Sequence, residues 1–477
     1  MKILARRTPL LVVLLYASQA FPQAAPSSSD HPWHGPGELS IEAEAKTIRE
    51  PTLKLDQAKA YSLAELIDLA EMHNPETHFA WERACAQAAA LGIARSELYP
   101  TLAAAAVSET SRSEIYFGTR FYRQTVQDFQ VGFDLNYTIF DFGGRAGRIS
   151  AARAEVLAVN FAFNDTHRQV IYEVEQAYYQ LLNASGQEDA AQASLANAKA
   201  VQQAAEERLN HGLATLPDVL EAKSATAQAE YELQAVLGAE EIAHGNLATA
   251  LGTSPTATIH VQPLKELPIP DATTDTVDLS IDRAFAQRPD LMEQVSEIRS
   301  ANARVKESRA ASYPSLTLNA NPAAQSLFGS QQTLPWGYTA DLGGALTLNL
   351  NWTVFDGGAR KSRLTQAQAN VQAAEAQVNV TRDQIADQVW TAYSNLNTAF
   401  RQRQAAIALL DAASKSYDAA LESYNYGLRN LLDVTAAQRT LAQARSADVF
   451  SRTQVLNALA VLAFQTGGSI QPGATRP

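Results

Sequence analysis

Two segments of the chain alternate between apolar and polar positions. Every odd position from Val131 to Ile139 is apolar and every even one is glycine or polar. The stretch from Leu346 to Val354 repeats the pattern, with its apolar residues on even positions. A period of two residues predicts β-strands, so each segment is expected to be a strand.

Each of these segments is expected to be the second strand of a pair, because weaker strands follow Pro100 and Pro314. The pairs then cover about 101–142 and about 315–356. A membrane β-barrel and a half-buried soluble sheet both produce this alternation, and the strands alone do not separate them. Four strands are too few to close a barrel, and unpaired strand edges are not tolerated in lipid. A barrel therefore requires several copies of the chain.

Helix-forming residues replace the alternation after two glycine pairs, Gly143-Gly144 and Gly357-Gly358. These glycines are expected to absorb the turn from strand to helix, because glycine adopts backbone angles that other residues avoid. From Gly144 to Asn210 the chain contains no proline. This predicts about 67 residues of nearly continuous helix, roughly 100 Å long. An ordinary long coiled coil is the structural alternative for this segment.

The second half of the chain repeats the first. Tyr137–Arg148 matches Trp352–Arg363 at six of twelve positions, and 14 residues from Leu209 match those from Tyr424 at seven, both with an offset of 215. Each half reads as helix, strand pair, very long helix and shorter helix, which predicts a mixed α and β fold made of a duplicated unit. The helices that precede the strand pairs are expected at about 61–98 and about 277–312.

The first residues have the order of a secretory signal peptide. Three basic residues precede the apolar run Leu10–Ala17, and small residues follow up to Ala20. The run is far shorter than the roughly 20 apolar residues of a membrane-spanning helix. We therefore expect an exported chain with a signal peptide at 1–20.

Composition and the repeat divide the remaining chain. A flexible leader is expected at 21–60 and a flexible tail at 468–477, because both contain many Pro, Gly and Ser residues. The two structural repeats and their turns are expected at 61–276 with a turn at about 210–218, and at 277–467 with a turn at about 425–433.

Charge, cysteine and histidine content limit the chemistry. The formal net charge of -12 argues against nucleic acid as a partner, and Cys85, the only cysteine, excludes a disulfide framework. An exported hydrolase is poorly supported. His73 and His78 lie near Cys85, but their spacing fits no zinc motif, and the chain has no Gly-x-Ser-x-Gly elbow and no phosphate loop. We expect no metal site, no cofactor and no enzymatic activity.

The repeat, the FDFGGR and FDGGAR junctions and two G-L-x-x-L-x-D-V turns together resemble the TolC family of outer-membrane efflux proteins, over about residues 60–467. The resemblance implies a homotrimer with an α-helical barrel through the periplasm and a 12-stranded β-barrel in outer-membrane lipid. It also implies a periplasmic adaptor and an inner-membrane pump of the RND, ABC or MFS type. The chain would then be a passive exit duct of a Gram-negative-type cell, for small-molecule efflux or alternatively for type I protein secretion.

The two turns are implied to be the periplasmic tips, where members of the family close the duct. Asp218, Tyr424, Arg429 and Asp433 fall at gate-like positions, and Gly212 and Gly427 lie in the turns themselves. The chain departs from the family pattern at two places. Pro217 replaces a hydroxyl residue before the first aspartate, and Ala436 replaces an acidic residue after the second.

The tip residues also have plain structural interpretations. Asp218 with Glu221 three residues later fits a helix capping box, and glycines are common where helices end. A cap explains Arg429 poorly and a carboxylate partner explains it well. We hypothesise that salt bridges and hydrogen bonds around Tyr424, Arg429 and Asp433 hold the tip shut, so that Tyr424→Phe with Arg429→Ser enlarges the pore current.

A periplasmic coiled-coil adaptor is the remaining alternative. It explains the long helices and the export signal but not two strand pairs with glycine junctions, and partitioning into the outer-membrane fraction separates the two interpretations. The sequence does not indicate the cargo, because a passive duct needs little chemical selectivity.

Overall fold

The computed structural model describes residues 30, 38–47, 59–264, 267–270, 276–331 and 334–468. The predicted signal peptide at 1–20, most of the predicted leader, and the tail from 469 onward lie outside the described residues. The chain divides into two compact units, Met1–Thr52 and Leu53–Pro477. Within the first, helix α2 (Glu38–Thr47) occupies part of the stretch expected to be a leader. In the described residues, no helix combines the length and the apolar character needed to span a bilayer.

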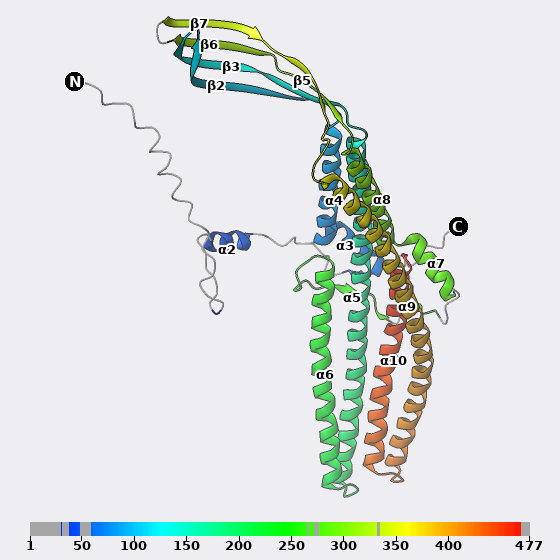
Figure 1. The fold of residues 1–477 in the computed structure, drawn as a ribbon. Helices are drawn as coiled ribbons and strands as arrows, with labels where there is room; N and C mark the ends of the chain where they lie inside the picture. Colours follow the sequence, from blue (N-terminus) through cyan, green and yellow to red (C-terminus); the bar gives the residue numbers. More distant parts are fainter. Residues whose placement is uncertain are drawn as a thin grey trace, which may run out of the picture. The chain divides into compact units, whose positions relative to one another are not determined.

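Among the described residues of the second unit, the helices form four pairs of equal length, with one member of each pair in each half of the chain (Figure 1). The pairs are α3 (Leu63–His73) and α7 (Val277–Gln287), α4 (Pro75–Ser96) and α8 (Pro289–Ala310), α5 (Gly144–Asn210) and α9 (Ala359–Asn425), and α6 (Leu216–Ala250) and α10 (Leu431–Gln465). Both long helices, α5 and α9, have 67 residues. The predicted mixed fold of two like repeats is confirmed.

Two helices that were expected to be continuous are each broken before a proline, so this part of the prediction was wrong. Asn74 and Arg288, which precede Pro75 and Pro289, have extended backbone angles. Proline disfavours the helical conformation in the residue before it. Each proline then begins the next helix, where its missing N–H has no partner to lose. The breaks separate α3 from α4 and α7 from α8.

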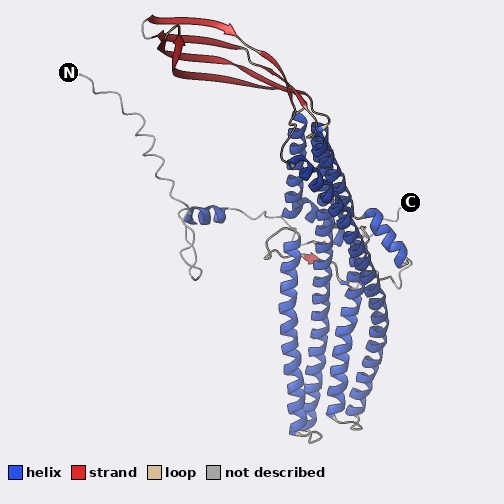
Figure 2. Ribbon diagram, viewed as in Figure 1, coloured by secondary structure: helices blue, strands red, loops and turns tan. Residues whose placement is uncertain are grey.

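The strand region of the second unit forms one sheet around the long strand β3 (Arg120–Phe140) (Figure 2). The other strands are β2 (Thr101–Phe117), β5 (Ser315–Ala320), β6 (Ala323–Gln331), β7 (Leu334–Gly343) and β8 (Leu346–Asn351). β3 pairs with β2 on one side and with β5 and β6 on the other, while β7 pairs with β6 and β8 pairs with β5. β2 therefore forms one edge of the sheet, and β7 with β8 forms the other.

The second strand pair is interrupted, where the sequence pattern predicts two continuous strands. Asn321 and Pro322 separate β5 from β6. Proline has no N–H to donate to a ladder, and the carbonyl oxygen of Pro322 accepts a hydrogen bond from the backbone N of Phe133 at 3.0 Å. A Cβ at Gly132 would lie 2.5 Å from that oxygen. Only glycine allows the two backbones to approach this closely.

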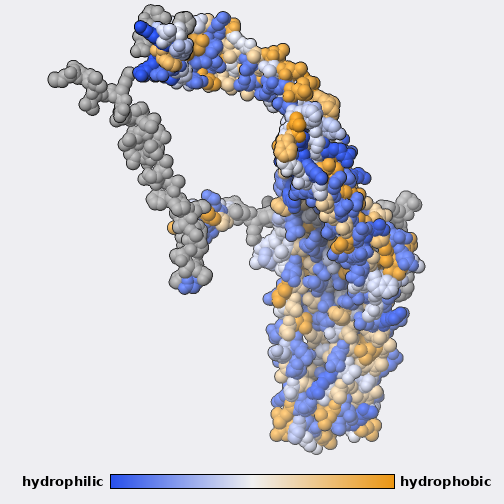
Figure 3. Space-filling view, viewed as in Figure 1, coloured by the Kyte–Doolittle hydropathy of each residue, from blue (hydrophilic) through white to orange (hydrophobic). Residues whose placement is uncertain are grey.

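The apolar residues of the alternating strands lie on one face of the sheet and stay exposed in a single chain. Phe133 of β3 is 54% exposed and Leu348 of β8 is 59% exposed. Figure 3 shows apolar side chains gathered on the part of the sheet nearest the helices and more polar ones toward its far end. A soluble sheet buries such a face, so this exposed surface is suited to lipid.

Both strand-to-helix junctions use an aspartate and an arginine in the same way. Oδ2 of Asp141 accepts a hydrogen bond from the backbone N of Arg145 at 2.6 Å, and Oδ2 of Asp356 accepts one from the backbone N of Arg360 at 2.9 Å. Each arginine also reaches back to a carbonyl that precedes the helix, that of Ile139 in β3 or that of Val354 just after β8, at 3.2 Å. The carboxylate thus satisfies a helix N–H that has no partner in its own helix.

The glycines of the junctions differ in their roles. Gly143 and Gly358 directly precede the two long helices, with φ of 94° and 89°. The residue before them is Phe142 in the first repeat, with φ of 50°, and Gly357 in the second, with φ of 67°. Gly144 is instead the buried first residue of α5. The turn is therefore made by residues 142–143 and 357–358.

Neighbouring helices follow a fixed order. Near the sheet the order is α4, α5, α8, α9, and farther from it the order is α6, α5, α10, α9. One apolar cluster surrounds Tyr178 and Leu247, and another joins the far ends of α5, α6, α9 and α10 around Tyr424. β1 (Ala60–Tyr61) pairs with β4 (His260–Val261) in parallel, and both strands contribute residues to the Tyr178 cluster. Helices α4 and α6 thus form one side of the arrangement and α9 forms the other.

Candidate functional site

The far ends of the helices are joined by two turns of the same geometry. Gly212 and Gly427 have φ of 73° and 75°. In the first turn the N of Leu213 donates to the carbonyl of Arg208 at 2.8 Å, and the N of Gly212 donates to that of Leu209 at 2.9 Å. The second turn has the same pair of bonds. This arrangement is a Schellman helix end, and it accounts for both glycines.

Asp218 caps the helix that follows the first turn. Its Oδ2 accepts hydrogen bonds from the backbone N of Thr215 at 2.8 Å and from Oγ1 of Thr215 at 2.7 Å. These bonds, and more weakly the charge of Arg208, lower the pKa of Asp218. The predicted capping box of Asp218 with Glu221 was therefore wrong, because the box begins three residues earlier and pairs Thr215 with Asp218. Glu221 instead forms an ion pair with Arg439 of α10 at 3.1 Å.

Tyr424 is buried beneath an arginine from the other long helix. Cζ of Arg208, in the last turn of α5, lies 4.5 Å from the centre of the Tyr424 ring. Nη1 of Arg208 donates to the carbonyl of Tyr424 at 2.7 Å and to that of Asn425 at 3.4 Å. The guanidinium thus contacts an aromatic face and caps carbonyls at the end of α9. We call this contact of Arg208 with Tyr424 the tip contact.

The hydroxyl of Tyr424 takes no part in the tip contact. It is buried and has no hydrogen-bond partner in the described part of the chain. Burial raises the pKa of Tyr424, and the charge of Arg208 partly offsets this effect. With only 4% of the residue exposed, a second copy of the chain does not reach the hydroxyl without a rearrangement.

Arg429 and Asp433 lie near Tyr424 in sequence but are not joined to it. Arg429 is exposed and forms no ion pair with the described residues of its own chain. The backbone N of Asp433 donates to Oδ1 of Asn430 at 3.0 Å, which begins helix α10. The cluster that the sequence predicts is therefore not assembled within one chain. A role for Arg429 and Asp433 in closing the tip requires partners from another copy.

Sequence analysis missed Arg208, although the repeat contains a signal for it. Position 208 corresponds to Ser423 in the second repeat, and Tyr424 corresponds to Leu209. The two contacting residues therefore lie at places where the repeats differ, in turns that are otherwise alike. Arg208 differs from Ser423 in charge and Tyr424 differs from Leu209 in aromatic character, so a comparison of these two properties at matched positions points to both residues.

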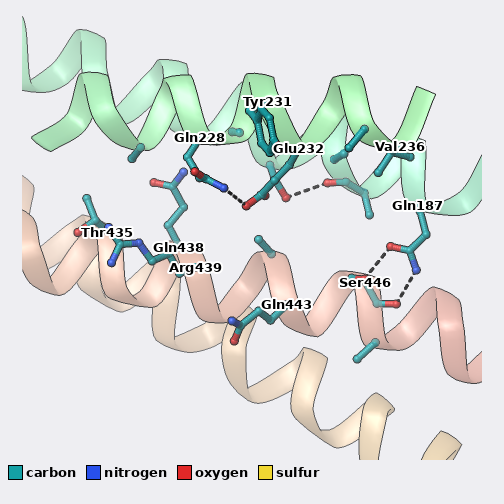
Figure 4. Close-up of a pocket in the computed structure, with 18 of the residues that line it drawn as sticks. Gln187, Gln228, Tyr231, Glu232, Val236, Thr435, Gln438, Arg439, Gln443 and Ser446 are labelled. Carbon is teal, nitrogen blue, oxygen red and sulfur yellow. Dashed lines mark hydrogen bonds between the residues drawn. The ribbon is translucent and has the colours of Figure 1, made fainter. Parts of the chain in front are cut away.

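A groove separates α6 from α10, which both pack on α5 (Figure 4). It has a volume of about 980 Å³, with alanines of α5 such as Ala190 among its lining residues. Figure 4 shows Tyr231 and Glu232 of α6 directed toward it. At one end Ser446 Oγ donates to Gln187 Oε1 at 2.7 Å, and Gln187 Nε2 donates to the Ser446 carbonyl at 2.9 Å. The groove thus combines alanines with polar side chains.

The histidine and cysteine positions of the first repeat form no site. His78 contacts Trp81 edge to face at 5.8 Å, and Cys85 is an exposed free thiol. Across the described ranges, no group of three or more His, Cys, Asp and Glu side chains is arranged to hold a metal ion. The candidate functional features are therefore the two tips and the groove between α6 and α10.

A sequence model of the family described as outer membrane efflux protein matches residues 66–253 and 280–468, one match in each repeat. The chain belongs to this family. The efflux protein is 28% identical to protein CyaE of Bordetella pertussis (strain Tohama I) over 417 residues, which cover 86% of this chain and 84% of CyaE. It is 24% identical to the cation efflux system protein CusC of Escherichia coli (strain K12) over 345 residues, covering 67% and 69% of the two chains.

Solved structures share the fold of the efflux protein. The outer membrane protein VceC from Vibrio cholerae matches with a TM-score of 0.71 and 22% identity, over 86% of this chain and 97% of VceC. The predicted TolC-like fold is thus confirmed. The efflux protein is an exit channel of the outer membrane with a long periplasmic extension, of the kind that serves efflux or secretion. Its family is one of channels and not a class of enzymes.

Proposed function

We propose that three copies of the efflux protein close head to tail into one duct, which a periplasmic adaptor and an inner-membrane pump load with small molecules. Each copy would contribute four strand segments to a 12-stranded barrel and four helix positions to a periplasmic tunnel. The observation that carries this proposal is a difference in burial between the two repeats.

Residues that are buried in the first long helix have exposed counterparts in the second. Four small residues of α5 near the sheet are buried, and the matched positions of α9, at an offset of 215, are exposed. The buried residues and their counterparts are Gly147, Ala151, Ala154 and Ala158, matched by Ser362, Gln366, Ala369 and Ala373. In α5 these positions lie against α8, as the 2.8 Å approach of a Cβ at Gly147 to the backbone N of Glu307 demonstrates.

The exposed face of α9 corresponds to the face of α5 that packs on α8. Because α4 is the counterpart of α8 in the other repeat, the helix that would cover this face of α9 is α4 of a second copy. Ala86, Ala89 and Ile93 of α4 are exposed, although their counterparts Ser300, Ala303 and Glu307 face α5 or are buried. Packing α9 of one copy on α4 of the next would bury both surfaces. This contact would have the same form as the contact of α5 with α8 within one chain. The two edges of the sheet would pair in the same step, which removes unpaired backbone from lipid.

The groove between α6 and α10 supports docking of a helical adaptor. Alanines permit close approach of another helix, and the glutamines and Glu232 along the groove offer hydrogen bonds to a polar partner.

Arg208 and the tip residues Asp218, Tyr424, Arg429 and Asp433 are proposed to keep the resting duct closed. The tip contact would tie the end of α5 to the end of α9 within each copy. Arg429 and Asp433 would act between copies, because neither has a charged partner within its own described chain.

Small molecules are the proposed cargo. The name of the relative CusC indicates efflux of cations, and this is consistent with passage of small solutes through a related duct. A strain lacking the gene should become sensitive to part of a panel of dyes, detergents, antibiotics and metal salts. Retained resistance together with loss of one secreted protein from the medium would favour type I secretion. Affinity purification from membranes treated with a crosslinker should recover an adaptor, and recovery of the channel alone would contradict the tripartite assembly.

A further inference from the structure

The outward face of the sheet has an apolar band of defined height. Residues that pair directly across two strands share a face, so Phe129, Val131 and Phe133 of β3 lie on the same face as Ser108, Ala106 and Ala104 of β2. From Phe129 to Phe140 the strand rises about 36 Å, which is about 25 Å of height at a tilt of about 45°. That is the height of the apolar band on membrane barrels.

Aromatic pairs mark both limits of this band. Toward the helices, the ring of Phe142 lies 4.7 Å from that of Phe140 and 5.0 Å from that of Tyr313. Toward the far end, Phe328 and Tyr338 lie 4.6 Å apart and are 42% and 62% exposed. Aromatic residues concentrate where hydrocarbon gives way to headgroups. The level of Phe328, opposite Gln127 of β3, is therefore the outer boundary of the hydrocarbon.

Two arginines lie on the same face just beyond that boundary. Arg112 is opposite Thr125, and Arg123 is opposite Glu114, which places them two and four residues past Gln127. At a tilt of about 45° these offsets are about 5 and 9 Å, within the headgroup layer. Arg123 Nε contacts Glu114 Oε1 at 3.3 Å, and both side chains are 61% exposed. Arg112 has no ion pair in the described part of the chain.

We propose that Arg112 and Arg123 bind the phosphate groups of anionic lipid in the outer leaflet and thereby fix the depth of the sheet. A guanidinium presents a planar fork of donors that matches a phosphate group. Glu114 holds Arg123 in place from the neighbouring strand. The outermost aromatic pair, Tyr116 and Phe121 at 5.0 Å, lies on the same face one step farther out. The inference rests on the ring of copies proposed above, because only a closed ring turns this face toward lipid.

The experiment uses the full protein in vesicles of phosphatidylcholine, with or without diphosphoryl lipid A. The temperature at which the oligomer dissociates is read by gel migration of heated and unheated samples. Lipid A should raise the dissociation temperature of the wild-type oligomer. The rise should be mostly absent in the double variant Arg112→Gln with Arg123→Gln. Arg120→Gln is the matched control, because Arg120 lies on the same strand end but on the opposite face, next to Phe121. It should retain the full effect.

Three results would overturn the inference. An equal response of the double variant and the wild type would exclude the arginines, and an equal loss with Arg120→Gln would indicate a general charge effect. An equal rise with inorganic phosphate in phosphatidylcholine vesicles would assign the site to the free ion. Failure of the wild type to form any heat-sensitive oligomer would instead contradict the proposed ring. High salt should weaken the lipid A effect, because it screens exposed charges.

Discussion

Removal of Arg208 should open the periplasmic tip more than removal of any residue chosen from the turn sequences. Arg208→Ala deletes a charged hydrogen bond of 2.7 Å to the Tyr424 carbonyl, a weaker one of 3.4 Å to the Asn425 carbonyl, and a ring contact at 4.5 Å. A hydrogen bond from a charged group contributes about 1.5–3 kcal/mol and a cation over a ring contributes about 1 kcal/mol. The sum for this half-buried side chain is about 3 kcal/mol per copy.

A change of about 3 kcal/mol shifts the ratio of closed to open tips by about 100-fold, since about 1.4 kcal/mol corresponds to a factor of ten. The measurement is single-channel current of the purified protein in planar bilayers. Arg208→Ala should raise the fraction of time spent in high-conductance states. For Arg208→Lys, the fraction of time in high-conductance states should lie between the values for Arg208→Ala and the wild type, because an ammonium keeps the charge but lacks the planar fork.

The tyrosine separates this mechanism from a hydroxyl-based lock. Tyr424→Phe should leave the current nearly unchanged, because the hydroxyl has no partner in the described part of the chain. Tyr424→Leu removes the ring face and should resemble Arg208→Ala. Arg429→Ser, measured alone, reports the contribution of contacts between copies.

Lys199→Ala provides the charge control for Arg208. Lys199 lies on the same helix and forms an exposed ion pair with Glu230 at 3.3 Å, which contributes little. Wild-type current from a folded, trimeric Arg208→Ala variant would refute the role of the tip contact. Opening by Tyr424→Phe alone would show that the hydroxyl acquires a partner on assembly.

Three further predictions concern assembly and stability. Ile93→Cys with Ser362→Cys, in a Cys85→Ser background, should crosslink separate chains on a non-reducing gel, and neither single variant should; absence of the crosslink would contradict packing of α9 on α4 of another copy. Burial raises the pKa of Glu175 to about 8, so its neutral form favours the folded state and this stability is lost as pH rises from about 4.5 through 8. Glu175→Gln should therefore match the wild type in urea unfolding at pH 4 and exceed it by a few kcal/mol at pH 9; a constant difference would exclude titration of this group. Gly147→Ala should lower the thermal midpoint, because its Cβ would lie 2.8 Å from the backbone N of Glu307, whereas Gly238→Ala, with nothing within 4 Å, should not.

Local signals in the sequence were sufficient to predict the long helices and the turns. The proline-free stretch from Gly144 gave the bounds of α5, because helix propensity acts within a few residues. The breaks at Pro75 and Pro289 were also visible locally, since proline restricts the residue before it. Pro322 carried the same kind of signal for the interrupted strands, because its missing N–H cannot join a ladder.

The candidate site was predicted less well because it depends on contacts between distant segments. Arg208 and Tyr424 are separated by 216 positions and meet only because the ends of α5 and α9 come together at the tip, where both pack with α6 and α10. No turn pattern contains that information. Arg429 forms no ion pair with the described residues of its own chain, so a gate that uses it depends on contacts between copies, which a turn motif does not encode.

The equal helix lengths of the two repeats affect how the proposed ring would be reached. The contact of α5 with α8 forms within one chain as it folds. Its effective concentration is set by the length of chain that connects the two helices and not by the number of chains present. The matching contact of α9 with α4 of another copy depends on how many chains are present. Duplication thus makes one of these two equivalent contacts independent of protein abundance, and a ring of three chains needs fewer encounters than a ring of six half-length chains would. Lowering expression should therefore deplete assembled channels more steeply than it depletes folded chains.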